Sequence, residues 1–268
     1  SFDASQAGVD ILKQGGNAVD AAVATSFALS IVRPESCGIG GGGFMMIDSP
    51  TMEPVALNYR ETAPAIVGPA YYETHNSREG GTASGVPGTV AGLLAAHQRY
   101  GVLTREQVLA PAIRLSRGHR QEHVMQKIAE NGKSGFYQGQ VADAIVAATG
   151  SHITLEDLAS YAPRWEKPLQ ITIGDGVTLV GMPPPSSGSV AIAQIIGLLQ
   201  RIIPNASTTD ELRYSQALVE SMKHAFADRA EHMADPTFVD VPVEELLDAT
   251  YLDSLASKIN LHKTQDTY

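Results

Sequence analysis

Cysteine and basic residues are scarce in this chain, and each scarcity argues against a class of protein. Cys37 is the single cysteine among 268 residues, so no internal disulfide framework can form. The 19 lysines and arginines stand against 29 aspartates and glutamates, a formal net charge of −10. No basic stripe interrupts that acidity, which argues against a nucleic-acid-binding surface. No histidine forms a local motif with Cys37, and this favours a small buried thiol over a nucleophile.

Long apolar runs are also lacking. The longest, residues 18–32, contains Asp20 and Ser30, so it is too short and too polar to span a bilayer and predicts a buried helix instead. The N-terminus lacks a charged segment followed by an apolar one, which is consistent with a mature or trimmed product. A hydrophobic content of 43% is typical of a globular protein. The chain has neither repeat nor linker, and we expect a single domain over residues 1–268.

Helical periodicity and capping residues predict most of the secondary structure. Asn17 and Thr104 can each cap a helix with a side-chain oxygen, and small side chains in the helix after Asn17 suggest that it lies flat on a sheet. Residues 65–84, 132–139 and 235–268 are expected to be irregular or fragmentary. The predicted helices cover residues 4–14, 18–32, 89–100, 105–116, 121–131, 141–149, 190–203 and 210–232, and a capping box at Thr154 opens a short turn.

Two pairs of strands interrupt the helices. Residues 43–48 and 55–59 form the first expected hairpin, and residues 169–173 and 177–181 form the second, around Gly174-Asp175-Gly176. Antiparallel strand pairs with segregated helices predict an α+β layered fold. Four short strands make a thin sheet for a chain of this length, so any further strands should come from another chain.

Four consecutive glycines, Gly40 to Gly43, mark the most unusual stretch. Such a run can take positive φ or bring the backbone close to another group. Together with Gly38 it matches the dinucleotide-binding spacing, and Glu61 lies where a ribose-binding acid would be sought. That motif must follow a strand and open a helix. Here the expected order is helix, glycines, strand, so the pattern does not favour a nucleotide site.

A metal site also lacks support in the sequence. His119 and His123 are the one pair of histidines at helical spacing. They lie among charged and polar residues, and this pattern indicates a solvated face.

Arg60, at the end of the second expected strand, is the candidate for substrate binding. A guanidinium group can hold a carboxylate through two parallel hydrogen bonds, which fixes both its position and its orientation. The residue type alone also fits a structural salt bridge to an acidic side chain, which is the commoner case, and both interpretations stay open at this point.

Seven short segments occur in an order that resembles the large subunit of the γ-glutamyltranspeptidase family. They include Ser-Cys-Gly-Ile-Gly-Gly-Gly-Gly-Phe over residues 36–44 and Tyr-Arg-Glu-Thr-Ala-Pro over residues 59–64. Together they extend from near residue 5 to about residue 245. The other five segments are residues 15–22, 84–92, 111–113, 182–188 and 227–229.

The resemblance implies an N-terminal-nucleophile hydrolase that arises as a zymogen and cleaves itself into two subunits. Its fold would be a four-layer αββα sandwich completed by the small-subunit chain. The threonine that begins the small subunit would be the nucleophile, with its own α-amine as the base, and would carry the γ-glutamyl group to water or to an amino acid or peptide. Glutathione-like compounds are the implied donors. No metal or organic cofactor is implied, and family members are exported to the periplasm, the medium or the cell surface.

Carried over residue by residue, the resemblance makes Arg60 the group that binds the α-carboxylate of the γ-glutamyl moiety. Glu61 would orient Arg60, and Tyr59 would support it. We expect no catalytic residue in this chain, because the Thr-Thr-His start of the family's small subunit is absent: Asp210 follows Thr208-Thr209, and Thr264 and Thr267 lack the right context. The alternatives are a poly-γ-glutamate enzyme or glutaryl-β-lactam acylase of the same fold, or a non-catalytic binding subunit.

Overall fold

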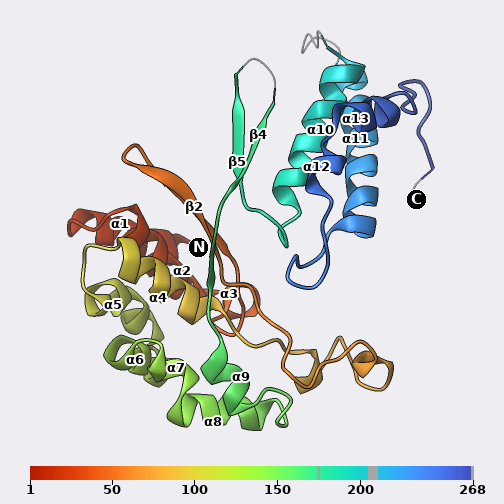
Figure 1. Ribbon diagram of the computed structural model, residues 1–268. Coiled ribbons are helices and arrows are strands. Elements are labelled where there is room, and N and C mark those ends of the chain that lie inside the picture. Colours follow the sequence, from red (N-terminus) through yellow and green to blue (C-terminus); the bar gives the residue numbers. More distant parts are fainter. Residues whose placement is uncertain (174–175, 205–210, 267–268) are drawn as a thin grey trace. The chain divides into compact units, whose positions relative to one another are not determined.

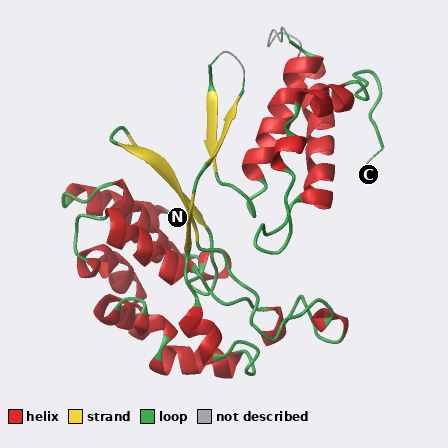
Figure 2. Ribbon diagram, in the orientation of Figure 1, coloured by secondary structure: helices red, strands yellow, loops and turns green. Residues whose placement is uncertain are grey.

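A computed structural model describes residues 1–173, 176–204 and 211–266 (Figure 1). The chain divides into two compact units, one comprising Ser1–Ile47 and Leu57–Trp165, the other Asp48–Ala56 and Glu166–Tyr268. Helices dominate the described residues and strands are few and short (Figure 2). The α+β class expected from the sequence is confirmed.

The first unit is built around helix α2 (Ala18–Val32), which has the bounds predicted from the sequence. Asn17 and Asp20 form a capping box at its start, in which each side chain accepts a hydrogen bond from the other residue's backbone N–H. The helix is buried, as expected, but its main neighbours are helices α1 (Phe2–Lys13), α4 (Thr89–Tyr100) and α5 (Arg105–Ser116). Its small side chains allow this close helix–helix contact, and the prediction that it lies flat on a sheet stays a prediction.

Strand β1 (Phe44–Ser49) is followed by β2 (Met52–Asn58), and β3 (Arg164–Glu166) completes a sheet in the order β1-β2-β3. Gly43 and Tyr59 exchange two backbone hydrogen bonds, of 3.2 and 2.9 Å, which is the pattern of an antiparallel pair. This confirms the first predicted hairpin, although its turn is shorter than expected. Strand β3 was not predicted, because three residues carry too little periodicity to be recognised.

The remaining helices of the first unit are α3 (Pro34–Cys37), α6 (Glu122–Asn131), α7 (Ser134–Tyr137), α8 (Gly139–Ala148) and α9 (Leu155–Ser160). Helix α7 lies where the sequence predicted a loop, and its Phe136 and Tyr137 are buried. The expected irregular stretch contains two short 3-10 turns, η1 (Tyr71–Glu73) and η2 (Gly81–Ala83). The predicted cap at Thr104 and the predicted capping box at Thr154 are both present, and Thr104 also forms a capping box.

In the second unit, β4 (Leu169–Thr172) and β5 (Thr178–Gly181) pair antiparallel, with Leu169 opposite Gly181. This confirms the second hairpin, whose turn residues Gly174 and Asp175 lie outside the described residues. Helices α10 (Gly188–Ile202) and α11 (Glu211–His232) match the two long predicted helices, except that Asp210 also lies outside the described residues. The stretch expected to be fragmentary contains α12 (Val243–Leu246) and α13 (Ala249–Ala256).

Asp228 of α11 joins the helices of the second unit. Its carboxylate accepts hydrogen bonds from Gln194 of α10, at 2.6 Å, and from the hydroxyl of Tyr251 in α13, at 2.7 Å. Gln194 also donates to the carbonyl oxygen of Leu246 in α12. Of the helices described, none combines the length and apolar character needed to cross a membrane.

Candidate functional site

The glycine run forms the turn from helix α3 into strand β1. The Gly41 carbonyl oxygen accepts hydrogen bonds from the N–H groups of Gly88, at 2.8 Å, and Thr89, at 3.0 Å, which fixes the start of α4 against the turn. None of the positive-φ glycines of the described chain falls between residues 38 and 43, so the expected left-handed backbone is absent. The close approach is present, because a Cβ atom at Gly42 would lie 2.5 Å from the Tyr59 carbonyl oxygen.

Tyr59 is buried and enclosed by glycines from two segments. Its ring lies against Gly43 and Gly92, and its carbonyl oxygen lies against Gly88. A side chain at Gly88 or Gly92 would overlap Tyr59, and one at Gly43 would be in very tight contact with its ring. Burial raises the pKa of the Tyr59 hydroxyl, which lies 3.5 Å from the Phe44 carbonyl oxygen. Tyr59 therefore acts as a spacer between β1 and α4, and it fixes where the following residue leaves the sheet.

Arg60 follows directly and is exposed. Its guanidinium lies over the Phe44 ring, 5.9 Å from the centroid, and no ion pair joins it to a carboxylate of the described residues. Its backbone is held on both sides: the N–H donates to Asn58 Oδ1 at 3.1 Å, and the carbonyl accepts from the Tyr161 hydroxyl at 2.9 Å. The structural salt bridge is thus not observed, and a fixed backbone presents an accessible positive charge.

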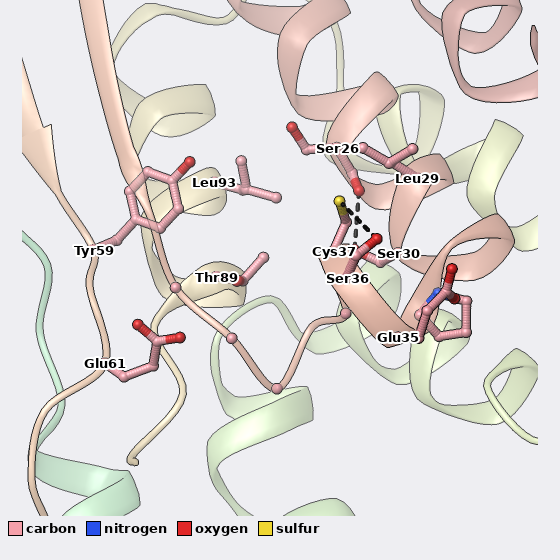
Figure 3. A pocket seen from close by; sticks show the side chains of 15 residues that line it. Ser26, Leu29, Ser30, Glu35, Ser36, Cys37, Tyr59, Glu61, Thr89 and Leu93 are labelled. Atoms are coloured by element: carbon pink, nitrogen blue, oxygen red, sulfur yellow. Dashed lines mark hydrogen bonds between the residues drawn. The ribbon is translucent and has the colours of Figure 1, made fainter. Parts of the chain in front are cut away.

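Glu61 faces the glycine turn (Figure 3). A Cβ atom at Gly42 would lie 2.8 Å from its Oε2. Glu61 was expected to orient Arg60, but no hydrogen bond or ion pair joins the two side chains in the part of the chain that is described. Burial, together with the negative charge of Glu61, raises the pKa of the Tyr161 hydroxyl.

Two stacked tyrosines support this region. The rings of Tyr137 and Tyr161 lie 5.9 Å apart and are parallel to within 2°. The Tyr137 hydroxyl donates to the Pro87 carbonyl at 2.7 Å and accepts from the Ala91 N–H at 3.3 Å, so it fixes the first turn of α4. Sequence reasoning missed both tyrosines, because neither belongs to a local motif.

Gly88 and Gly92 were missed as well, although the sequence carries a signal for Gly92. A glycine inside a helix lowers stability by about 1 kcal/mol relative to alanine, so Gly92, within α4, indicates that something packs closely there. Gly88 is the N-cap residue of the same helix.

A pocket of about 470 Å³ opens beside the glycine turn, and its polar side chains include Cys37 and Glu61 (Figure 3). Cys37 is exposed, with its sulfur 3.7 Å from Ser36 Oγ. The predicted burial of this thiol was wrong, because the short helix α3 contains no buried residue. The pocket is lined by Ser26, Leu29, Ser30, Pro34, Glu35, Ser36, Cys37, Gly38, Gly40, Gly41, Gly42, Tyr59, Glu61, Thr89 and Leu93.

His119 and His123 are both exposed, as their polar surroundings predicted. Within the described ranges, no three histidine, cysteine or acidic side chains are grouped so that they could hold a metal ion. Of the threonines considered from the sequence, Thr264 donates its hydroxyl to Glu220 of α11 at 2.8 Å. Thr208, Thr209 and Thr267 lie outside the described residues.

Comparison with known proteins identifies relatives of this chain. A sequence model of the family described as gamma-glutamyltranspeptidase matches residues 4–127 and 120–268. The chain is 34% identical to the glutathione hydrolase proenzyme of Escherichia coli, over 98% of its own length and 54% of that protein's. It is 36% identical to the glutathione hydrolase proenzyme of Pseudomonas aeruginosa, over 93% of its length and 54% of that protein's.

A solved structure, γ-glutamyltranspeptidase from Pseudomonas nitroreducens complexed with L-DON, superposes with a TM-score of 0.87 at 34% identity. The match covers 100% of this chain and 95% of that one. The chain thus spans about half the length of the curated relatives that it matches, but nearly all of the solved chain. On the matches over its whole length, the chain belongs to the γ-glutamyltranspeptidase family, with the N-terminal-nucleophile hydrolase type of fold.

Proposed function

We propose that this chain is the large subunit of a γ-glutamyl hydrolase or transferase and that it forms one domain, residues 1–268, with a small subunit cut from the same precursor. Two observations support this. The curated relatives are named proenzymes and are nearly twice as long as their match to this chain. The solved chain from Pseudomonas nitroreducens, by contrast, has about the same length as this chain.

In the proposed reaction, the γ-glutamyl group of a glutathione-like donor passes to the N-terminal threonine of the small subunit. The resulting ester then yields the group to water or to an amino acid or peptide. The nucleophile and its base, the α-amine of the same threonine, both belong to the partner. The task of this chain is to hold the donor, and it needs neither a metal nor an organic cofactor for that.

Arg60 is the proposed binding group for the donor's α-carboxylate. The observation that carries the proposal is its accessible guanidinium, which forms no ion pair with a carboxylate of the described chain while its backbone is bonded on both sides. Two parallel N–H···O bonds to the α-carboxylate would set the distance from this group to the γ-carbonyl carbon. Tyr59 supports the position of Arg60 from the buried side, and Glu61 shapes the neighbouring glycine turn.

Kinetics of Arg60→Ala in the processed enzyme test the proposal. Loss of a charge-assisted pair costs about 1.5–3 kcal/mol, so we expect KM for γ-glutamyl substrates to rise roughly 10- to 150-fold. Arg60→Lys should recover only part of the loss, because an ammonium group lacks the planar fork. Arg117→Ala, an exposed arginine at the end of α5, is the control and should leave KM unchanged. An unchanged KM in Arg60→Ala would remove Arg60 from the substrate site.

Intact mass measurement of the purified enzyme tests the partner. We expect a second polypeptide that begins with threonine. A single species with no activity would support a non-catalytic binding subunit. Turnover of poly-γ-glutamate or of glutaryl-β-lactams in place of glutathione would instead identify a poly-γ-glutamate enzyme or a glutaryl-β-lactam acylase. Export to the periplasm, the medium or the cell surface is part of the proposal, and cell fractionation tests it.

A further inference from the structure

Helix α11 exposes its large apolar side chains and buries polar ones. Leu212, Val219, Met222 and Phe226 are 83%, 48%, 40% and 51% exposed. Their spacing of seven, three and four residues places them on one face of the helix, and we call them the α11 stripe. The buried residues of the same helix are Ala217, Glu220, Ser221, His224, Ala225 and Asp228. A surface helix normally turns its apolar stripe inward, so this arrangement indicates that another surface covers the stripe.

The tail of the chain is held on the same helix. The Glu220 carboxylate, fully buried, accepts hydrogen bonds from Thr264 Oγ1 at 2.8 Å, from the Gln265 N–H at 3.3 Å and from Lys223 Nζ at 2.9 Å. Lys223 also donates to the Gln265 carbonyl at 2.8 Å, and His224 Nε2 lies 3.1 Å from Gln265 Oε1. These contacts form a clamp that fixes residues 264 and 265 on α11.

The clamp adjoins the stripe. Lys223 follows Met222 directly and comes four residues after Val219, and side chains at i, i+4 are neighbours on a helix. The polypeptide therefore reaches α11 beside the exposed apolar side chains. If the proposed function holds, the second chain follows this one in the precursor, and its sequence would continue from the clamped residues.

We propose that the α11 stripe is the docking surface for the second chain cut from the same precursor. The proposal rests on the proposed function, from which it takes its partner. Before cleavage the partner is tethered through the clamp, so its effective concentration at the stripe is far above that of any independent molecule. A second copy of this chain lacks that advantage, which is why the precursor-derived chain is the favoured occupant.

Photo-crosslinking in the full-length, processed enzyme tests the docking surface without disturbing the fold. Met222→p-benzoylphenylalanine places the probe in the stripe. Ile192→p-benzoylphenylalanine is the matched control, because Ile192 is 48% exposed on α10. We expect an adduct between this chain and the second chain from position 222 and none from position 192. An adduct of two copies of this chain, or no adduct from position 222, overturns the proposal.

A charged substitution gives an independent readout. Val219→Asp should reduce the amount of second chain that copurifies with this chain by about tenfold, the effect of losing 1.4 kcal/mol of binding, whereas Ile192→Asp should leave it near the unmodified level. Equal retention in both variants overturns the docking surface. If the unmodified preparation has no second chain at all, the proposed function itself fails. If an active second chain is present but position 222 does not crosslink to it, only the docking surface fails.

Discussion

The hydroxyl group of Tyr161 donates a 2.9 Å hydrogen bond to the carbonyl oxygen of Arg60, across 101 positions of the chain. The ring of Tyr161 is buried and stacked on Tyr137, so this donor has little freedom to move. The bond fixes the backbone of Arg60 while the guanidinium stays accessible. The hydrogen bond from Tyr161 thus sets the position of the Arg60 backbone, while the guanidinium of Arg60 supplies the charge.

Removing that hydroxyl should weaken substrate binding without removing the charge. Tyr161→Phe eliminates one hydrogen bond, worth about 0.5–1.5 kcal/mol, and should raise KM for γ-glutamyl substrates about 2- to 10-fold, less than Arg60→Ala does. Steady-state kinetics of the processed enzyme measure the effect. Tyr72→Phe is the control, because its exposed hydroxyl donates to the Thr82 carbonyl, away from Arg60. If Tyr161→Phe lowers the melting temperature but leaves KM unaltered, the bond has no role in positioning Arg60.

Gly92→Ala should destabilise the protein even though alanine favours a helix. The added Cβ would overlap the ring of Tyr59, and overpacking typically costs about 1–3 kcal/mol. The gain in helix propensity is only about 1 kcal/mol. Thermal unfolding should therefore show a lower midpoint for Gly92→Ala. Gly40→Ala should change it little, because nothing lies within 4 Å of a Cβ atom there. Equal midpoints would show that Tyr59 can move away.

The clamp on α11 should depend on pH through Glu220. Burial by itself would raise the pKa of this carboxyl group, but hydrogen bonds from Lys223, Thr264 and the Gln265 N–H outweigh burial and lower the pKa. Because the folded pKa lies below the ordinary value of about 4.3, the clamp contributes its full stability above that pH. It loses this stability as the pH falls through the folded value.

Hydrogen exchange of residues 264–266 in the processed enzyme measures this dependence. Near pH 7, Glu220→Gln should exchange faster than the unmodified chain, and the difference should shrink below about pH 4. Glu231→Gln, at an exposed carboxyl group of the same helix, should show no difference at either pH. A difference that grows as the pH falls would contradict the lowered pKa of Glu220.

Local signals predicted the helix ends well. Helices α2, α4 and α5 have the bounds expected from the sequence, because a cap such as Asn17 acts on residues two and three positions away. The burial of Cys37 was predicted wrongly, since burial depends on segments distant in the sequence. Short elements such as α7 and β3 were missed, because three or four residues show no periodicity.

The candidate site was predicted only in part, because some of its residues are brought together from distant positions in the sequence. The resemblance to a known family singled out Arg60 and the glycine run. The residues that hold them, Tyr161 and Gly88, lie 101 positions after Arg60 and 47 positions after Gly41 in the sequence. No spacing rule connects groups so far apart, and only the folded chain brings them together.

The glycines around Tyr59 have a consequence for sequence divergence. The ring fills the space that side chains at positions 43 and 92 would otherwise occupy. The residue types at positions 43, 59 and 92 therefore cannot change independently during evolution. A lineage that replaces Tyr59 by a smaller residue leaves room for a side chain at position 92, and a lineage that first gains one there must lose the ring. Across related sequences, residue volume at position 59 should therefore be anticorrelated with residue volume at position 92.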